Sequence, residues 1–203
     1  HDAGLDKDIL PQRLPLFGRK GKIYGVPQSL SAMVLYYRKD LFEELQITPE
    51  DMATWDSFVY HGKRLKAKGQ ATIALDPTYF EILLRQRGSD LFDEDGKLFP
   101  DEKLAIETLN WMRDLNTDGI GVLPDRASIF DPVFFNSAVS SGEILSIIGA
   151  DWYGLDMLQQ FTPELKGKWG VMPLPAWVRK DGSLSARTST FAGQGLLLYK
   201  GGA

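Results

Sequence analysis

The chain has 203 residues, 43% hydrophobic and 25% charged, which is enough to bury a core without disulfide or metal support. It contains no cysteine, which excludes disulfides and zinc sites built from thiolates. Its 23 Lys and Arg are outnumbered by 27 Asp and Glu, and the net charge of −4 argues against a nucleic-acid partner because no basic stripe is available to neutralise phosphates.

Apolar runs, helix caps and turn residues predict an alternation of strands and helices. Thr54 is a typical helix N-cap and Gly69 a typical helix end, while Asp76 and Asp131 are each followed by a first-turn proline. The apolar run at 33–37 is typical of a strand buried on both faces. In chain order, we expect strands at 22–27 and 33–37, helices at 41–46 and 55–69, a strand at 71–75, helices at 77–88, 101–116 and 132–142, and strands at 143–149, 169–175 and 195–199.

This alternation predicts an α/β layer structure. No apolar run approaches the roughly 20 residues that a membrane-spanning helix needs. In an open α/β sheet, ligands bind in the crevice beyond the carboxyl ends of the strands. The residues that follow each strand are therefore the first place to look for a site.

No catalytic, metal or cofactor motif stands out. His61 lies within a predicted helix, and no serine has the Gly-x-Ser-x-Gly setting of a hydrolase nucleophile. The Gly193-Gln-Gly195 pair precedes a strand rather than opening a helix, and the acidic residues at 90–95 lack the ligand spacing of a calcium loop. A carboxylate pair for glycoside hydrolysis stays open, because only its separation in space would reveal it.

Aromatic residues follow two of the predicted strands. The first junction places Asp76 near Tyr79, and the second places Asp151 beside Trp152. An aromatic face suits the apolar C–H surface of a sugar ring, and neighbouring carboxylates suit its hydroxyls. Small residues such as Gly149 leave room for a ligand at the second junction. Burial in the core is the alternative interpretation for these aromatics.

Several segments, in order along the chain, resemble the extracellular solute-binding proteins of ABC transporters, the family that includes maltose-binding protein. No single segment is specific, but their order covers nearly the whole chain. Those segments are 22–27, 35–42, 54–58 with 65–69, 93–97, 142–152, 170–175 and 191–195.

The resemblance implies a class II periplasmic-binding-protein-like fold, in which two α/β lobes are joined by a hinge. This chain would supply one lobe and its hinge strands, with the first lobe largely absent. Residues 1–27 would form a connector and the first hinge strand, 28–190 the C-terminal ligand-binding lobe, and 191–203 a truncated return hinge strand.

The function implied is non-catalytic and needs no cofactor: a monomer binds a sugar or oligosaccharide and delivers it to a membrane-embedded ABC permease. The protein would be periplasmic or extracellular, and anchoring as a lipoprotein to the outer face of the membrane stays open. Two alternatives keep a similar lobe. The cargo would be a polyamine, a phosphodiester or a ferric ion, or the lobe would serve a sensor or an enzyme.

By position within the resemblance, Trp152 is the expected stacking platform, with Tyr79 or Phe80 as a second. Ser31 falls on a loop that carries a polar ligand contact in relatives, and Gln194 lies in a glycine-rich return. That return departs from the family pattern of paired glycines. The predicted ligand-binding residues are Gln28, Ser31, Asp76, Tyr79, Phe80, Asp151, Trp152, Tyr153, Gly193 and Gln194.

Overall fold

The computed structural model describes residues 4–124, 128–191, 193–197 and 199, and contacts within the chain divide it into two compact units. The larger unit comprises residues 32–189, and the smaller one comprises residues 1–31 together with 190–203. The two units are described separately below.

A mixed five-stranded sheet forms the centre of the larger unit. The strand β4 runs antiparallel to both of its neighbours, β7 and β8, whereas β5 runs parallel to β6 and β7. All strands except β4 therefore point the same way, so β5 and β7 end at the edge where β4 begins. In spatial order the strands are β6 (Gly121–Val122), β5 (Ala71–Ala74), β7 (Ile144–Ala150), β4 (Met33–Arg38) and β8 (Trp169–Pro173).

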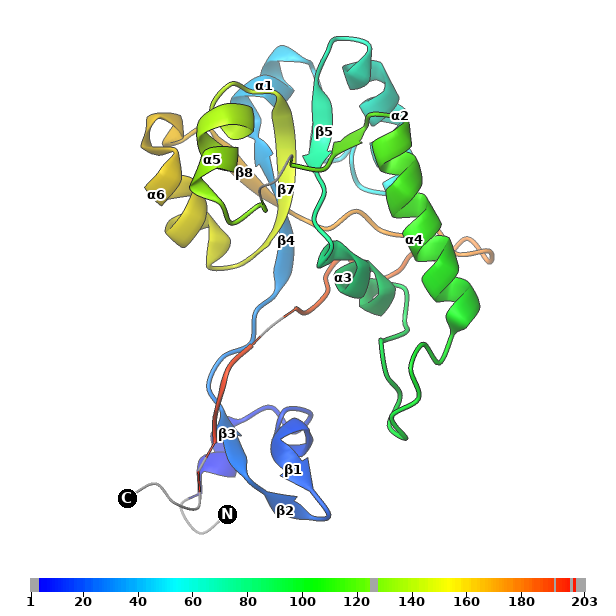
Figure 1. The fold of residues 1–203 in the computed structure, drawn as a ribbon, viewed down its shortest axis with the longest axis vertical. Helices are drawn as coiled ribbons and strands as arrows, with labels where there is room; N and C mark the ends of the chain where they lie inside the picture. Colours follow the sequence, from blue (N-terminus) through cyan, green and yellow to red (C-terminus); the bar gives the residue numbers. More distant parts are fainter. Residues whose placement is uncertain (1–3, 125–127, 192, 198, 200–203) are drawn as a thin grey trace. The chain divides into compact units, whose positions relative to one another are not determined.

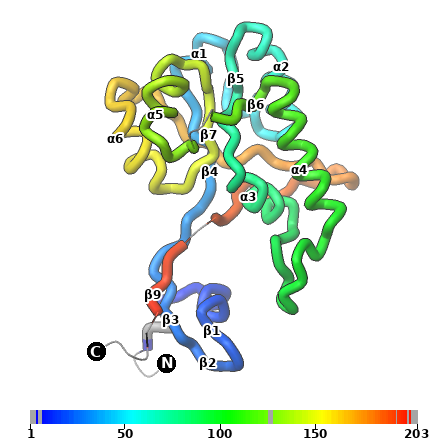
Figure 2. The backbone as a smooth tube through the Cα atoms, viewed as in Figure 1, coloured from blue at the N-terminus to red at the C-terminus, as the bar shows by residue number. Residues whose placement is uncertain are grey.

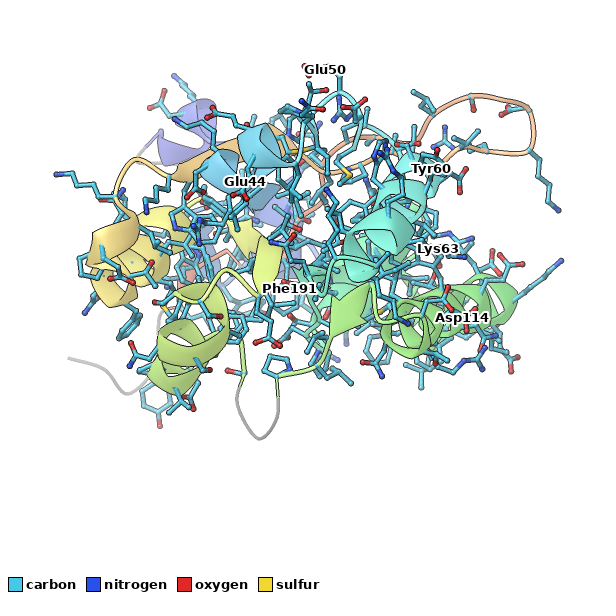
Figure 3. The ribbon with its side chains drawn as sticks, turned by 90° about the horizontal axis from the view of Figure 1, so that it is seen from above. Glu44, Glu50, Tyr60, Lys63, Asp114 and Phe191 are labelled. Carbon is cyan, nitrogen blue, oxygen red and sulfur yellow. The ribbon has the colours of Figure 1, made fainter. Side chains whose placement is uncertain are left out.

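Helices cover the sheet from two sides. Figures 1 and 3 show α2 and α4 on one side and α5 and α6 on the other, which explains why every residue of β5 and β7 is buried. No helix in the described part of the chain has the length and apolarity needed to span a bilayer. The helices are α1 (Lys39–Glu44), α2 (Trp55–Lys66), α3 (Tyr79–Gln86), α4 (Glu102–Thr117), α5 (Pro132–Phe134) and α6 (Gln159–Phe161).

Both short helices adjoin a π-helical turn. The turn Phe135–Val139 continues α5, and the turn Gly154–Leu158 precedes α6, which is followed by a 3-10 turn at Pro163–Leu165. The helix predicted at 132–142 begins at Pro132 as expected, but it consists of α5 and the π-helical turn and ends at Val139.

The residues around Thr54 determine where helix α2 begins. The Thr54 hydroxyl accepts from the Ser57 N–H at 3.1 Å, and the Ser57 hydroxyl accepts from the Thr54 N–H at 3.1 Å, a reciprocal capping box. In Figure 3, Tyr60 and Lys63 of α2 lie on the same side of the molecule as Asp114 of α4. The opposite face of α2 buries apolar side chains against the sheet, namely Trp55, Phe58 and Leu65.

The smaller unit contains short paired strands. The strand β3 (Gly25–Pro27) pairs antiparallel with β9 (Gly195–Leu197), which lies far away in sequence (Figure 2). The strand β1 (Gly18–Arg19) pairs with β2 (Lys22–Ile23), and the 3-10 turns Leu5–Asp8 and Leu14–Phe17 precede them.

Two predicted strands of this unit end differently in the structure. The strand predicted at 22–27 is divided into β2 and β3, because the chain changes strand partner at Tyr24, whose N–H donates to the Phe17 carbonyl at 2.9 Å. The strand predicted at 195–199 is observed as β9 over Gly195–Leu197, and Tyr199 is not in a strand. Residues 192, 198 and 200–203 of the predicted return segment lie outside the described residues.

Candidate functional site

The two aromatic junctions lie at one edge of the central sheet. Asp76 follows β5 and Asp151 follows β7, and these strands run parallel. The antiparallel strand β4 begins at the same edge, where the Asp151 N–H donates to the Ala32 carbonyl at 3.1 Å. The topology thus brings both carboxylates to the end of the sheet that open α/β folds use for ligands.

Trp152 is the aromatic residue that this edge exposes after β7. Its side chain is 39% exposed, and its ring stacks near-parallel with that of Phe130, at 24° and with ring centres 6.2 Å apart. Phe130 is itself 41% exposed. Two exposed aromatic rings, rather than one, therefore lie together at this edge of the sheet.

Tyr153, the next residue, points into the core. It is 0% exposed, and its hydroxyl donates to the carbonyl of Ile129. Burial raises the pKa of this hydroxyl well above its usual range, and the nearby Asp76 and Tyr36 add to the effect. A neutral, hydrogen-bonded tyrosine in this position fixes the segment that carries Phe130 but presents no ring face to a ligand.

The space beside Gly149 is filled by protein. A Cβ on Gly149 would lie 2.8 Å from Cγ of Tyr153, so the glycine allows the tyrosine ring to pack against the strand. The expectation that this small residue leaves room for a ligand is therefore wrong. The room is taken by the side chain four residues later.

Tyr79 also belongs to the core. It is 1% exposed, and its hydroxyl both donates to the Ile148 carbonyl at 3.0 Å and accepts from the Ile148 N–H at 2.9 Å. These bonds join the start of α3 to β7. Burial leaves the Tyr79 ring no face for a ligand, so Tyr79 is not the second platform for which Tyr79 and Phe80 were the predicted candidates.

The two carboxylates have different surroundings. Asp76 is only 5% exposed, and its Oδ1 accepts from the N–H and the hydroxyl of Thr78 at 2.9 and 2.6 Å. Asp151 is exposed beside Trp152. Burial raises the pKa of the Tyr36 hydroxyl, which donates to the Ala150 and Asp151 carbonyls, and the Asp151 charge raises it further. Asp151 is thus the carboxylate better placed to accept from a solute hydroxyl.

Phe80 is half-buried and packs against a different segment. Its ring lies edge-on to Phe99 at 6.0 Å between ring centres. Phe99 is therefore the ring partner of Phe80. Among the ring contacts of the described residues, none joins Phe80 to Trp152 or Phe130.

The remaining predicted residues belong to the smaller unit. The Gln194 carbonyl accepts from the Gln28 N–H at 2.8 Å and from the Ser29 N–H at 3.2 Å, so residues distant in sequence are joined there. Gly193 has φ of 124°, a left-handed conformation that favours glycine. Ser31 is buried, whereas both glutamine side chains are exposed.

The described residues contain no cluster of three or more His, Cys, Asp or Glu that would hold a metal ion. Beyond Asp151, a groove of about 510 Å³ extends between the first turn after β7 and the edge strand β8. Its lining is mixed and includes Tyr36, Asp151, Leu155, Trp169 and Val171.

Phe130 is the residue of the exposed pair that the sequence analysis missed. It precedes Asp131, whose Oδ1 caps α5 by accepting from the Val133 N–H at 2.8 Å. The Asp131–Pro132 helix start was visible in the sequence, but an aromatic before a cap does not by itself indicate a ligand contact. Long-range contacts show that this segment lies beside Trp152, namely the ring stack of Phe130 on Trp152 and the bond from the Tyr153 hydroxyl to the Ile129 carbonyl.

The chain matches the sequence profile of the family described as "Bacterial extracellular solute-binding protein" over residues 2–203. It is 27% identical over 186 residues to the arabinooligosaccharide-binding protein of Bacillus subtilis (strain 168), covering 89% of this chain and 42% of the relative. It is 32% identical over 178 residues to the protein of the same name from Halalkalibacterium halodurans, covering 85% of this chain and 39% of that relative.

Among solved structures, it resembles the galacto-N-biose/lacto-N-biose I-binding protein of the ABC transporter from Bifidobacterium longum, in complex with lacto-N-biose. The TM-score is 0.74, with 20% identity, covering 98% of this chain and 49% of that one. At this identity the likeness shows a shared fold alone. The chain spans about two fifths of the length of the two curated relatives and about half of the solved protein.

Proposed function

Because this chain belongs to the family of bacterial extracellular solute-binding proteins, we propose that it is the ligand-binding lobe of a receptor for a sugar or oligosaccharide. In this proposal residues 28–190 form the lobe, and residues 1–27 and 191–203 supply the hinge segments. The receptor captures its ligand outside the cell and delivers it to a membrane-embedded ABC permease. It acts as a monomer and catalyses no reaction.

One observation carries the sugar assignment: two near-parallel exposed rings, Trp152 and Phe130, at the end of β7, where the exposed Asp151 immediately precedes Trp152 in the chain. The C–H face of a sugar ring packs on an aromatic face, and a carboxylate accepts from two hydroxyls at the ring edge. The relatives named above bind arabinooligosaccharide or lacto-N-biose by their names, which supports the same ligand class.

The other predicted contacts have different support. We keep the predicted roles of Trp152 as stacking platform and of Asp151 as acceptor of hydrogen bonds from sugar hydroxyls. Both residues are exposed at the edge of the sheet where β5 and β7 end. Tyr79, Tyr153 and Asp76 support this edge from within the core. Gln28, Ser31, Gly193 and Gln194 stay proposed polar contacts on the basis of the family resemblance, and Phe80 stays a proposed contact of the same kind.

The family is described as extracellular, and we propose that this protein lies in the periplasm or at the outer face of the cell membrane. A lipid anchor is one way in which it would be held at that face. The alternative ferric cargo loses support, because the Tyr36 hydroxyl is buried and bonded to two backbone carbonyls rather than open to a metal. No observation favours a polyamine or a phosphodiester.

Titration calorimetry of the whole protein against a panel of sugars, polyamines and phosphodiesters tests the assignment. We expect a sugar to bind, and Trp152→Ala to weaken it at least about thirtyfold, as loss of a dominant aromatic contact does. Tyr60→Ala, which removes an exposed ring on α2, is the matched control and leaves binding unchanged. A Trp152→Ala protein with wild-type affinity, or a panel in which only non-sugars bind, would contradict the proposal.

A further inference from the structure

A cavity of about 310 Å³ lies between the C-terminal half of α2 and the segment that follows α1. Residues three, four and seven positions apart share one face of a helix. This spacing brings the basic side chains of His61, Arg64 and Lys68 to the side of α2 that lines the cavity, whereas the other wall is apolar. The lining consists of Leu45, Ile47, His61, Arg64, Leu65, Ala67 and Lys68.

The cavity and the candidate sugar site lie at opposite ends of the strand β5. Lys68, which lines the cavity, comes just before β5 begins at Ala71, whereas Asp76 follows the end of the strand at Ala74. A ligand in the cavity therefore does not occupy the residues that follow β5 and β7, and its binding can be measured independently of sugar binding.

His61 contributes a buried nitrogen atom without a partner. Its Nδ1 makes no hydrogen bond with any described residue. Buried side-chain nitrogens are nearly always hydrogen-bonded in folded proteins, because an unpaired one loses its bonds to water without replacement. A neutral imidazole carries its proton on either nitrogen, so Nδ1 can act as a donor. A ligand with an acceptor atom, bound in the cavity that His61 lines, would supply the missing partner.

The two cationic side chains of the cavity have no ion-pair partner. Among the described residues neither Arg64 nor Lys68 forms an ion pair, whereas Lys63 on the same helix pairs with Asp118 at 3.3 Å. No Asp or Glu is among the described residues that line the cavity. Basic residues also suit the carbonyl end of a helix, which explains their presence on α2 but not the cavity between them.

One carboxylate close to these groups is already engaged. Asp51, in the turn before α2, accepts through one oxygen from the N–H and the hydroxyl of Thr48, at 2.8 and 2.9 Å. These bonds lower the pKa of Asp51, and the nearby His61 and Arg64 lower it further. Asp51 thus offsets part of the positive charge from outside the cavity and leaves the cavity itself without an anion.

We propose that this cavity is a second ligand site, which binds a small organic carboxylate with a short hydrocarbon chain. The carboxylate accepts from His61 Nδ1 and lies between the charges of Arg64 and Lys68. The hydrocarbon chain packs on the wall formed by the half-buried Leu45 and the buried Ile47. The inference does not depend on the proposed sugar-binding function.

Both parts of such a ligand are needed for binding. Hydrogen bonds to an ionised acceptor are stronger than those between neutral groups, so a neutral alcohol of the same length gains less from the basic side chains. A carboxylate without a chain removes little apolar surface from water and leaves the wall of the cavity uncovered. The combination separates this site from a basic surface that attracts any anion.

Titration of the isotope-labelled whole protein with hexanoate, hexan-1-ol and acetate, followed by the NMR signals of its backbone amides, tests the proposal. Hexanoate is expected to shift the signals of residues 61–68 and 45–47. It is expected to bind at least about tenfold more tightly than either of the other two compounds. Hexanoate that leaves these signals unmoved, or hexan-1-ol that binds as tightly, would overturn the proposal.

Variants of α2 then locate the anion. His61→Leu is expected to weaken hexanoate binding about tenfold, the size of a lost hydrogen bond to a charged group, and Lys68→Gln about fourfold. Lys63→Gln removes the same charge from a side chain that pairs with Asp118, and is expected to change binding by less than about 1.5-fold.

His61→Asn places an amide donor close to the position of Nδ1 and is expected to bind more tightly than His61→Leu, which guards against a folding defect in the leucine variant. Equal losses in Lys63→Gln and Lys68→Gln would show that the charge of the helix, rather than the cavity, attracts the anion, and would overturn the proposal. Unchanged binding in both His61 variants would overturn it as well.

Discussion

At the scale of single residues, Trp152 and Tyr153 show the limit of what the sequence reveals. Both are aromatic and both follow the same buried strand, yet the first is exposed and the second lies in the core. The direction in which each side chain points depends on how the chain turns after Ala150, and on the space that Gly149 leaves for the Tyr153 ring. The sequence predicted that aromatic residues follow this strand, but it did not show which of the two rings is exposed to solvent.

Tyr153→Phe is expected to destabilise the protein. The change keeps the ring but removes the hydroxyl that donates to the buried carbonyl of Ile129. A buried acceptor without its donor costs about 1–3 kcal/mol of the free energy of unfolding. Urea unfolding of the wild type and variant measures the difference. Tyr60→Phe, on an exposed position of α2, is expected to stay within about 0.5 kcal/mol. An unchanged midpoint for Tyr153→Phe would mean that the bond contributes nothing to stability.

Tyr79 predicts a loss of stability in alkali. Burial raises the pKa of its hydroxyl well above the usual value, with smaller increases from Tyr153 and Asp76. The folded state therefore keeps the phenolic proton at a pH where the unfolded chain releases it. This contribution to stability is complete below a pH of about 10, the ordinary tyrosine value, and is lost as the pH rises towards the folded-state pKa.

The measurement is urea unfolding at a series of pH values from about 8 to about 11, chosen to cross the ordinary tyrosine pKa. The free energy of unfolding of the wild type is expected to fall above a pH of about 10, by at most about 1.4 kcal/mol per pH unit for this residue. Tyr79→Phe has no proton to release there, so its curve falls less steeply, although the variant is less stable at neutral pH. Parallel curves would show that Tyr79 does not carry the dependence.

At the scale of elements, local signals predicted some boundaries well. The expected cap at Thr54 and stop at Gly69 are confirmed by the capping box of α2 and by the left-handed φ of 82° at Gly69. These features act within one turn of chain. In contrast, β6 was not predicted, because its two residues are a strand only through pairing of Gly121 with Ile73 of β5. The π-helical turns likewise have no local signature that the sequence displays.

Thr54→Ala is expected to lower the stability of the larger unit by about 1 kcal/mol, the usual cost of losing an N-cap. The substitution removes the hydroxyl that accepts from the Ser57 N–H, whereas the bond from the Thr54 N–H to the Ser57 hydroxyl remains. Helix α2 packs Trp55 and Phe58 against the sheet. Thermal and urea unfolding measure the change. Thr54→Ser keeps the hydroxyl and is the matched control, expected within about 0.5 kcal/mol of the wild type. Equal stability of the alanine and serine variants would show that the cap is dispensable.

At the scale of the whole molecule, the predicted class II periplasmic-binding fold is confirmed by the fold that the chain shares with a solved receptor. Hydrophobic periodicity alone predicted an α/β architecture but not the spatial order β6, β5, β7, β4, β8, in which β7 lies between β4 and β5. That order depends on long-range pairing, such as Met33 with Ala150. The ordered family-like segments supplied what periodicity could not, because they carry information about the fold as a whole.

The exposure of the candidate site predicts that residues 1–203 alone bind the sugar weakly. Trp152 and Phe130 each keep about two fifths of their surface in water, so a ligand on them is covered on one face only. Small-molecule sites of high affinity bury roughly 70–90% of the ligand surface. We therefore expect residues 1–203 to bind the sugar at least about a hundredfold more weakly than the whole protein, a loss of about 2.7 kcal/mol. Calorimetry on both proteins measures this, after circular dichroism has confirmed that the shorter one is folded. Equal affinities would show that residues 1–203 hold the complete site.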